Sequence, residues 1–324
     1  MNKIAEYQQL INDEIESLKL GQEPTEVYDP IYYMLSIGGK RLRPLLVVLA
    51  HEMFKSNAIR VIHPALAVEL FHNFTLVHDD IMDKAPLRRG KKTIHEKWNP
   101  NVAILSGDVM FVKVYEMLQR VDSDKLPHAL ELFNKCAVEV CEGQQLDMNF
   151  ETRNDVKEEE YLEMIRLKTA VLLGFSLNLG AYLGGANDAE CELLRKFGEN
   201  IGVGFQLKDD LLDVYGDKEK FGKQVGGDII ANKKTWLLIK ALELAQGDER
   251  AILDKWLSAD NYDPNEKVRQ VTAVYDKLGI KQLAEKKIDE FFEEGFLNLA
   301  SIEVEKERKG TLRQFTNFLI SRDH

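Results

Sequence analysis

Cysteine is scarce in this chain, and its three residues, Cys136, Cys141 and Cys191, have no spacing typical of a metal site. An odd, widely spaced set argues against a disulfide framework and favours a reducing, cytoplasmic location. We expect Cys136 and Cys141 to be small core residues on a helix. The sequence also lacks an N-terminal apolar run and any uncharged apolar stretch of about 18 residues, which argues against a signal peptide and a membrane span.

Linkers are missing too, because only eight prolines occur in 324 residues and no repeat or low-complexity segment is present. We therefore expect a single domain over residues 1–324.

Positive charge is in deficit, since 43 Lys and Arg against 54 Asp and Glu give a formal net charge of −11. This balance argues against general binding to nucleic acid or to an anionic membrane, and leaves only local basic clusters to explain.

Strand-like alternation of apolar and polar residues does not occur in any convincing run. Apolar residues instead recur at three-and-four spacing, which predicts helices and an all-α fold built as one large helical bundle. Residues 84–100 and the glycine-rich residues 216–228 stand out as loops. The spacing predicts helices over residues 61–83, 101–119, 131–150, 157–185, 191–217, 235–245, 265–300 and 302–320.

Two acidic clusters share one spacing. In HDDIMD, residues 78–83, Asp79 and Asp83 are four apart, so on a helix they share a face and lie about 6 Å apart along its axis. The same pattern recurs in KDDLLD, residues 208–213, again at the end of an apolar helix. One such cluster alone would fit a solvated helix end. Two of them, about 130 positions apart, are hard to explain by solvation.

Oxygen ligands without neighbouring Cys favour Mg²⁺, which is usually shared between carboxylates, waters and a substrate phosphate. Calcium is disfavoured because the chain has no EF-hand loop, and zinc is disfavoured by the ligand type. Two acidic helix faces holding Mg²⁺ would bind a polyanion. The acidic clusters therefore predict a site for a diphosphate.

Basic residues gather beside the first acidic cluster and at a few other places. Arginine offers a planar fork for phosphate oxygens and lysine a point charge. Each taken alone also fits a solvated surface, and a lysine inside an apolar helix often extends to solvent. No G-x-x-x-x-G-K-[ST] run is present, so nucleotide hydrolysis is not supported. The candidates are Lys40, Arg41 and Arg43 in GGKRLRP, Arg88 and Arg89 in LRRGKK, Lys168 in RLKTA, and Lys223 and Lys233 around the glycine-rich loop.

In chain order these motifs resemble the polyprenyl synthetase family of trans-isoprenyl diphosphate synthases, which make geranyl, farnesyl and geranylgeranyl diphosphates. The resemblance extends from about residue 38 to residue 236. It rests on GGKRLRP, HDDIMDKAPLRRG, GD at 107–108, KTA at 168–170, FQLKDDLLD at 205–213, and GK, GGD and K between 222 and 233. It implies a short-chain prenyltransferase, usually a homodimer, whose helices surround a deep central cavity.

The resemblance also implies roles for single residues. Isopentenyl diphosphate would be bound by Lys40, Arg43, His72 and Arg89. The allylic diphosphate would lie on Mg²⁺, three ions per active site, held by Asp79, Asp83 and Asp209, with Asp80 and Asp213 close to the metals. Arg88, Lys168 and Lys233 would contact its oxygens, Lys223 would lie on a loop that closes over the site, and Thr169 and Gln206 would face the developing positive charge.

Product length is expected to depend on the helix before Asp79. Phe74 and Phe71 precede it by five and eight positions, about 7.5 and 12 Å along the axis. Two rings there would stop growth before C30. Thr75, and the lack of a two-residue insertion in the acidic motif, favour geranylgeranyl diphosphate (C20), whereas NKKTW at 232–236 favours farnesyl diphosphate (C15). C20 ranks slightly higher, and plain core packing of both rings stays open.

Two other interpretations of the same residues remain. A class I terpene cyclase also uses D-D-x-x-D, but its second metal site is usually an Asn/Ser/Glu triad, where this chain has DDLLD. A non-catalytic subunit of a heteromeric prenyl synthase would be expected to have lost aspartates or basic residues, and none is missing from the pattern. The favoured prediction is a catalytic prenyltransferase that condenses isopentenyl diphosphate with dimethylallyl, geranyl or farnesyl diphosphate.

Overall fold

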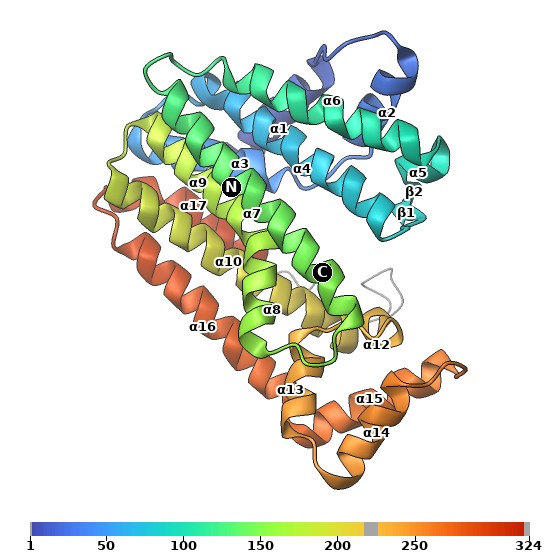
Figure 1. Cartoon of the computed structure of the whole chain (residues 1–324). Helices are drawn as coiled ribbons and strands as arrows, with labels where there is room; N and C mark the ends of the chain where they lie inside the picture. The colour runs from blue at the N-terminus through green and yellow to red at the C-terminus, as the bar shows by residue number, and fades with distance from the viewer. Residues whose placement is uncertain (1, 217–225, 321–324) are drawn as a thin grey trace. The chain divides into compact units, whose positions relative to one another are not determined.

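A computed structural model describes residues 2–216 and 226–320 of the chain (Figure 1). Within those residues the only strands are β1 (Leu87–Arg88) and β2 (Lys91–Lys92), and all other regular structure is helical. The predicted all-α fold is confirmed. The small hairpin falls inside the predicted loop 84–100, and strands of two residues are too short to show an alternating pattern.

The chain divides into two compact units, each made of separate stretches of sequence. The first unit comprises Met1–Lys135, Phe175–Arg195 and Glu303–Phe315, and the second comprises Cys136–Gly174, Lys196–Ile302 and Thr316–His324. The expectation of a single domain stays a prediction.

Helices of the first unit are α1 (Asn2–Ser17), α2 (Thr25–Ser36), α3 (Leu42–Phe54), the 3-10 turn η1 (Ala58–Val61), α4 (Ile62–Met82), α5 (Ile94–Lys97) and α6 (Pro100–Leu118). Four helices contribute residues to both units: α7 (Leu126–Thr152), α9 (Val171–Gly184), α10 (Asp188–Tyr215) and α17 (Lys306–Ile320). Those of the second unit are α8 (Glu158–Ile165), the π-helical turn η2 (Arg166–Ala170), α12 (Gly227–Ile230), α13 (Trp236–Leu244), α14 (Gly247–Leu257), α15 (Pro264–Leu278) and α16 (Ile280–Ala300).

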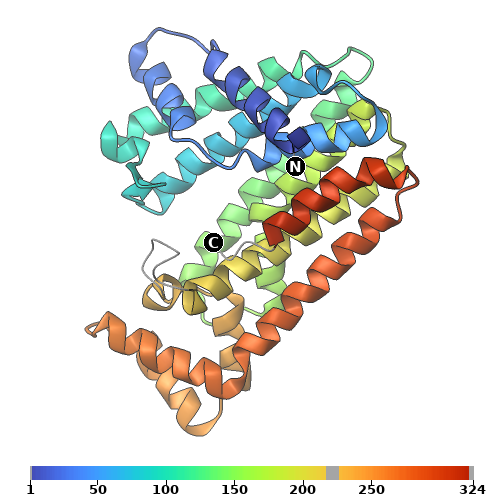
Figure 2. The same ribbon diagram turned by 180° about the vertical axis from the view of Figure 1, so that it is seen from behind.

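Helices α4 and α6 pack against each other in the first unit (Figure 1), and α1 packs against α3 (Figure 2). Helix α6 begins where the sequence predicts, because the Asn99 side chain accepts the Val102 N–H at 2.9 Å and Pro100 follows the cap. A Cβ at Gly107 would lie 2.3 Å from Nε2 of His78, so a larger residue there would have to displace that ring. Helix α6 therefore approaches the acidic end of α4 closely at the glycine of the GD motif.

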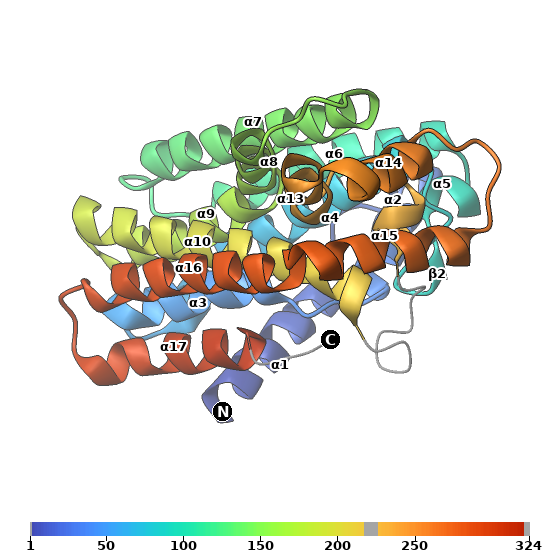
Figure 3. The ribbon, with the colours of Figure 1, turned by 90° about the horizontal axis from the view of Figure 1, so that it is seen from below.

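Two of the predicted helices are divided. The stretch 265–300 forms α15 and α16, because Gly279 adopts φ 70° and ends α15 with a left-handed cap. Helix α15 lies beside α14 (Figure 3). The stretch 157–185 is interrupted by the π-helical turn η2 at Arg166–Ala170. Such turns insert one extra residue into a helix and often occur at functional sites.

The prediction that Cys136 and Cys141 are both core residues is wrong for one of them. Cys136 is buried, whereas Cys141 is exposed. Five positions on an α-helix turn a side chain by about 140° relative to the first, so the two cysteines cannot share the buried face of α7.

One helical stretch among the described residues, Glu158–Gly184, is long and apolar enough to cross a membrane by length and composition alone. However, 78% of its most apolar window is buried inside the structure. A core helix of a folded protein passes the same test, so this stretch is weak support for a membrane span.

Candidate active site

The last turn of α4 presents the first acidic cluster. The Asp83 N–H donates to the Asp79 carbonyl at 2.9 Å, so the helix continues through this turn and both side chains leave it on one side. Asp83 is exposed, and the Asp79 side chain is 20% exposed. These two carboxylates are therefore accessible to a cation from solvent.

Asp80, between them, has a different environment. It is buried and accepts two bonds from Arg88, from Nε at 2.8 Å and from Nη2 at 2.7 Å. Burial raises the pKa of Asp80, and the paired guanidinium opposes that rise. The same Nη2 lies 3.6 Å from Asp79. Asp80 therefore holds Arg88 at the acidic end of α4. Its role is to support the arginine, whereas Asp79 and Asp83 are the carboxylates that a cation can reach.

The β1–β2 hairpin carries Arg88 and Arg89. Leu87 pairs with Lys92 across it, and its two central residues, Arg89 and Gly90, have φ of 51° and 74°. Positive φ at both positions is the pattern of a type I′ turn, which matches the twist of a two-residue hairpin. The turn directs Nη1 of Arg89 to the carbonyl oxygen of Gly38, so the hairpin joins the GGKRLRP motif to the LRRGKK motif.

Three residues predicted to bind isopentenyl diphosphate lie close together in the first unit. Nη1 of Arg43 is 3.1 Å from Nε2 of His72. Burial holds the pKa of His72 well below its usual 6.5, and the charges of Arg43 and Arg89 lower it further. The neutral ring can therefore accept the Arg43 bond at Nε2, which leaves the proton on Nδ1. Lys40, the fourth predicted residue, is exposed on the same segment.

Arg41 differs from its neighbours Lys40 and Arg43. It is only 6% exposed, and its guanidinium donates to Glu69 at 2.6 Å and to the Leu35 carbonyl at 2.7 Å. The backbone of Arg41 is left-handed, with φ 48°. The buried ion pair with Glu69 of α4 therefore stabilises a left-handed backbone conformation that is otherwise unfavourable. It also fixes the backbone from which the side chains of Lys40 and Arg43 project.

An aromatic cluster of the first unit contains both predicted floor residues. Phe71 is fully buried, and its ring centre lies 5.7 Å from that of Phe74 and 5.2 Å from that of Phe133. Phe111 of α6, which the sequence reasoning missed, lies 5.1 Å from Phe74. Its position four residues after Gly107 is the only signal that could have found it. Thr75 is half-buried, and its hydroxyl donates to a carbonyl of its own helix at 2.8 Å.

In the second unit, Lys168 lies on the π-helical turn and pairs with Asp147 of α7 at 2.6 Å. This ion pair argues against the alternative that Lys168 is a surface lysine whose side chain extends into solvent. Gly143, one turn before Asp147, permits it, because a Cβ there would lie 2.2 Å from the Lys168 backbone nitrogen. Asp147 was missed, although a glycine in the middle of a helix is a recognised sign of close packing.

Thr169, next on the same turn, lies beside Gln206 of α10, with 3.4 Å between Oγ1 and Oε1. The Gln206 amide nitrogen donates to Asp210 at 3.1 Å, and the buried hydroxyl of Tyr161 donates to the other oxygen of Asp210. Burial raises the pKa of Asp210 to about 7. The structure thus joins two predicted residues to two that the sequence reasoning did not assign, Tyr161 and Asp210.

The second acidic cluster is divided differently from the first, because its third aspartate also makes a structural hydrogen bond. Asp209 is exposed on α10, whereas Asp213 accepts the Asp228 N–H at 2.9 Å through its side chain. Asp213 therefore holds the start of α12. Lys233 is exposed after α12, and its N–H donates to the Asp228 carbonyl at 2.9 Å. Lys223 lies outside the described residues.

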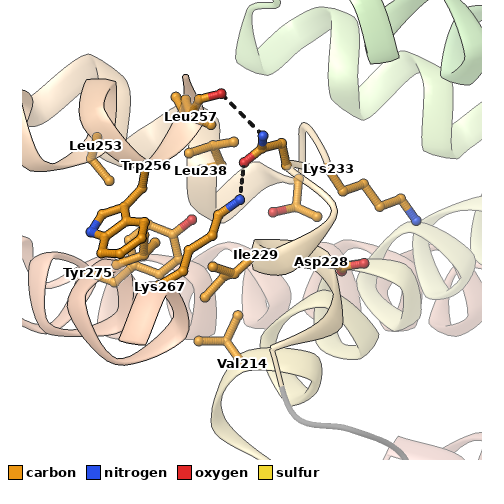
Figure 4. A pocket seen from close by; sticks show the side chains of 13 residues that line it. Val214, Asp228, Ile229, Lys233, Leu238, Leu253, Trp256, Leu257, Lys267 and Tyr275 are labelled. Atoms are coloured by element: carbon orange, nitrogen blue, oxygen red, sulfur yellow. Dashed lines mark hydrogen bonds between the residues drawn. The ribbon is translucent and has the colours of Figure 1, made fainter. Parts of the chain in front are cut away.

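The turn before Lys233 is supported by a buried lysine (Figure 4). Nζ of Lys267, from α15, donates to Oδ1 of Asn232 at 2.6 Å and to the Ile230 carbonyl at 3.1 Å. Asn232, with φ 54°, donates in turn to the Leu257 carbonyl at 3.3 Å. These bonds hold a left-handed turn and direct the chain toward Lys233.

Comparison with known proteins identifies the family to which the chain belongs. A sequence model of polyprenyl synthetase matches residues 24–276. The chain belongs to the polyprenyl synthetase family. It is a prenyltransferase with the all-α isoprenoid synthase fold.

Relatives of this polyprenyl synthetase cover nearly its whole length. Geranylgeranyl pyrophosphate synthase of Geoglobus acetivorans is 39% identical over 99% of the chain and 98% of its own length. Geranylgeranyl diphosphate synthase of Methanosarcina mazei is 40% identical over 93% of the chain and 91% of its own. A crystal structure of a geranylgeranyl pyrophosphate synthase superposes with a TM-score of 0.94 at 42% identity, covering 99% of both chains.

Proposed function

We propose that this prenyltransferase condenses isopentenyl diphosphate with dimethylallyl, geranyl and farnesyl diphosphates in turn, with geranylgeranyl diphosphate as its main product. The observation that carries the proposal is the charge arrangement at the end of α4. Two accessible carboxylates, Asp79 and Asp83, lie next to Arg88, while Arg43, His72 and Arg89 are held together nearby in the same unit. Such a grouping suits two polyanions, one bound through metal and one bound directly by cations.

Mg²⁺ fits the donor set of the acidic clusters. In residues 2–216 and 226–320, no three His, Cys, Asp or Glu side chains form a complete cage. Mg²⁺ needs no such cage, because it is typically held by one or two carboxylates together with waters and substrate phosphates. We infer that Asp79 and Asp83 of the first cluster and Asp209 of the second would act as Mg²⁺ ligands, with Asp213 as a further candidate. Bound there, Mg²⁺ would stabilise the departing diphosphate.

The chain's own residues would act around the breaking allylic C–O bond. Arg88, Lys168 and Lys233 bring positive charge to the diphosphate oxygens as they become more negative. The oxygens of Thr169 and Gln206, side by side in the second unit, would face the carbocation that remains. Arg43 and Arg89 would orient isopentenyl diphosphate so that its double bond meets the cation before water does.

The aromatic cluster supports a product of intermediate length. Phe74 is half-buried and is backed by the fully buried Phe71 and by Phe111, so an isoprenoid chain growing along α4 would meet rings from two helices. The two relatives compared above are both named for geranylgeranyl diphosphate. We therefore favour C20 over C15. We further expect a homodimer in the cytoplasm.

The test is an elongation assay with purified protein, isopentenyl diphosphate and each of the three allylic diphosphates, followed by chromatography of the dephosphorylated products. Geranylgeraniol should dominate from every primer. Absence of elongation with all three allylic diphosphates would refute the proposal that the protein is a prenyl diphosphate synthase. Cyclic products formed without isopentenyl diphosphate would support a terpene cyclase instead.

A further inference from the structure

We propose that Tyr161 is a positioning residue that holds the Gln206 amide in one orientation by way of the Asp210 carboxylate. The inference rests on the proposed function, in which the oxygens of Gln206 and Thr169 face the allylic cation. It assigns a role to a tyrosine that lies outside every motif identified in the sequence.

The four side chains form a linked set within the second unit. Tyr161 lies on α8 and Thr169 on the π-helical turn that follows, while Gln206 and Asp210 are one turn apart on α10. Tyr161 meets Asp210, and Thr169 meets Gln206 at 3.4 Å, so the two segments run antiparallel at this point. The 3.1 Å bond from Gln206 to Asp210 connects the two meeting points along α10.

Chemistry decides which end of the Gln206 amide faces each neighbour. The Gln206 amide nitrogen donates to one oxygen of Asp210 at 3.1 Å, while the Tyr161 hydroxyl donates to the other, so the nitrogen end of the amide faces Asp210. The carbonyl oxygen is then turned to the opposite side, where the Thr169 hydroxyl lies. A reversed amide would place oxygen against a carboxylate oxygen and would turn N–H groups toward the cation, which is the wrong dipole for stabilising positive charge.

Tyr161 stabilises the buried Asp210 carboxyl group by donating a hydrogen bond to it. Asp210 is only 2% exposed, and a buried carboxylate is stable only when donors satisfy its oxygens. Tyr161, itself 1% exposed, supplies a donor to one oxygen and leaves the other for Gln206. Without the tyrosine hydroxyl, only the Gln206 amide among these four side chains would still donate to Asp210. The amide would then shift toward Asp210, and its oxygen would move away from the Thr169 hydroxyl.

Tyr161→Phe removes the hydroxyl and keeps the ring, and Tyr275→Phe is a matched control, because Tyr275 is 2% exposed in the same unit. Elongation is measured at saturating and limiting substrate, alone and combined with Gln206→Leu. Circular dichroism melting of each variant checks that it is folded. Tyr161→Phe is expected to lower kcat about tenfold, the effect of losing one buried hydrogen bond, with KM for both substrates within about twofold.

In the Gln206→Leu background, Tyr161→Phe is expected to change kcat by less than about twofold, because the amide that it positions is gone. The same tenfold loss in both backgrounds would overturn the inference, as would a rise in KM with unchanged kcat or a full-rate Tyr161→Phe enzyme. Wild-type protein is assayed in parallel. Failure of the wild type to elongate refutes the proposed function itself, whereas a normal wild type with any of those results refutes only the role of Tyr161.

Discussion

Replacing Phe74 by alanine is expected to lengthen the product by one isoprenoid unit. Phe74 and Phe71 are three positions apart, so removing the first ring opens about 4.5 Å along the axis of α4 before the second is met. That distance is roughly one five-carbon unit of an extended chain. The main product should therefore change from C20 to C25. Growth beyond C25 should be rare, because Phe71 is fully buried against Phe74 and Phe133 and cannot easily move aside.

The Phe111 ring lies 5.1 Å from Phe74 and 6.1 Å from Phe71, so removing it together with Phe74 should free space into which Phe71 can move and extend the product to C30. Truncation of a buried phenylalanine typically lowers stability by about 3–5 kcal/mol, and the half-buried Phe74 should fall at or below the low end of that range. Reversed-phase chromatography of the dephosphorylated products gives the chain length directly. Phe54→Ala, a half-buried ring at the end of α3, is the matched control. Normal turnover with unchanged lengths in both Phe74 variants would show that Phe74 is core packing.

Three further predictions concern ionisable side chains in the protein interior. Arg41→Met should lower the free energy of unfolding in urea by about 3–5 kcal/mol, because it leaves Glu69 charged and unpaired. Adding Glu69→Leu should recover most of this loss, and a neutral single variant would contradict the assignment. The low pKa of His72 predicts that stability falls as pH drops below about 6.5, since the unfolded chain then binds a proton that the folded ring does not. His72→Gln should remove that component in urea titrations, and an unchanged pH dependence would count against it. Lys267→Met should lower stability by about 1–3 kcal/mol and raise KM for the allylic substrate more than for isopentenyl diphosphate, because the Asn232 turn before the allylic-binding lysine loses its support. Equal effects on both KM values would contradict this role.

Helical periodicity and motif order were enough to predict the fold class and to put Asp79 and Asp83 on one face of a helix. Asp79 and Asp83 are four residues apart on one helix, so their shared face follows from local geometry alone. The break at Gly279 did not follow, since a glycine inside a helical pattern is tolerated unless tertiary packing favours the left-handed cap.

Long-range contacts explain what the sequence reasoning missed. Lys40, Arg41 and Arg43 look equivalent in GGKRLRP, and only the position of Glu69, 28 residues away, makes the middle one a buried structural residue. Phe111 and Asp147 likewise gain their roles from the helices that pack against them, α4 for the first and the π-helical turn for the second. Apart from the nearby glycines at 107 and 143, the sequence carries no sign of those neighbours.

The most direct test of the proposed function is the Mg²⁺ dependence of elongation in the wild type and in Asp79→Asn. After chelation, wild-type protein given isopentenyl and farnesyl diphosphates should make no geranylgeranyl diphosphate, and added Mg²⁺ should restore synthesis. Asp79→Asn should be about a hundredfold or more slower at saturating Mg²⁺, since one charge that holds the metal is lost. Elongation that continues in chelator, or an Asp79→Asn enzyme with wild-type rate, would contradict the metal-assisted site at the end of α4.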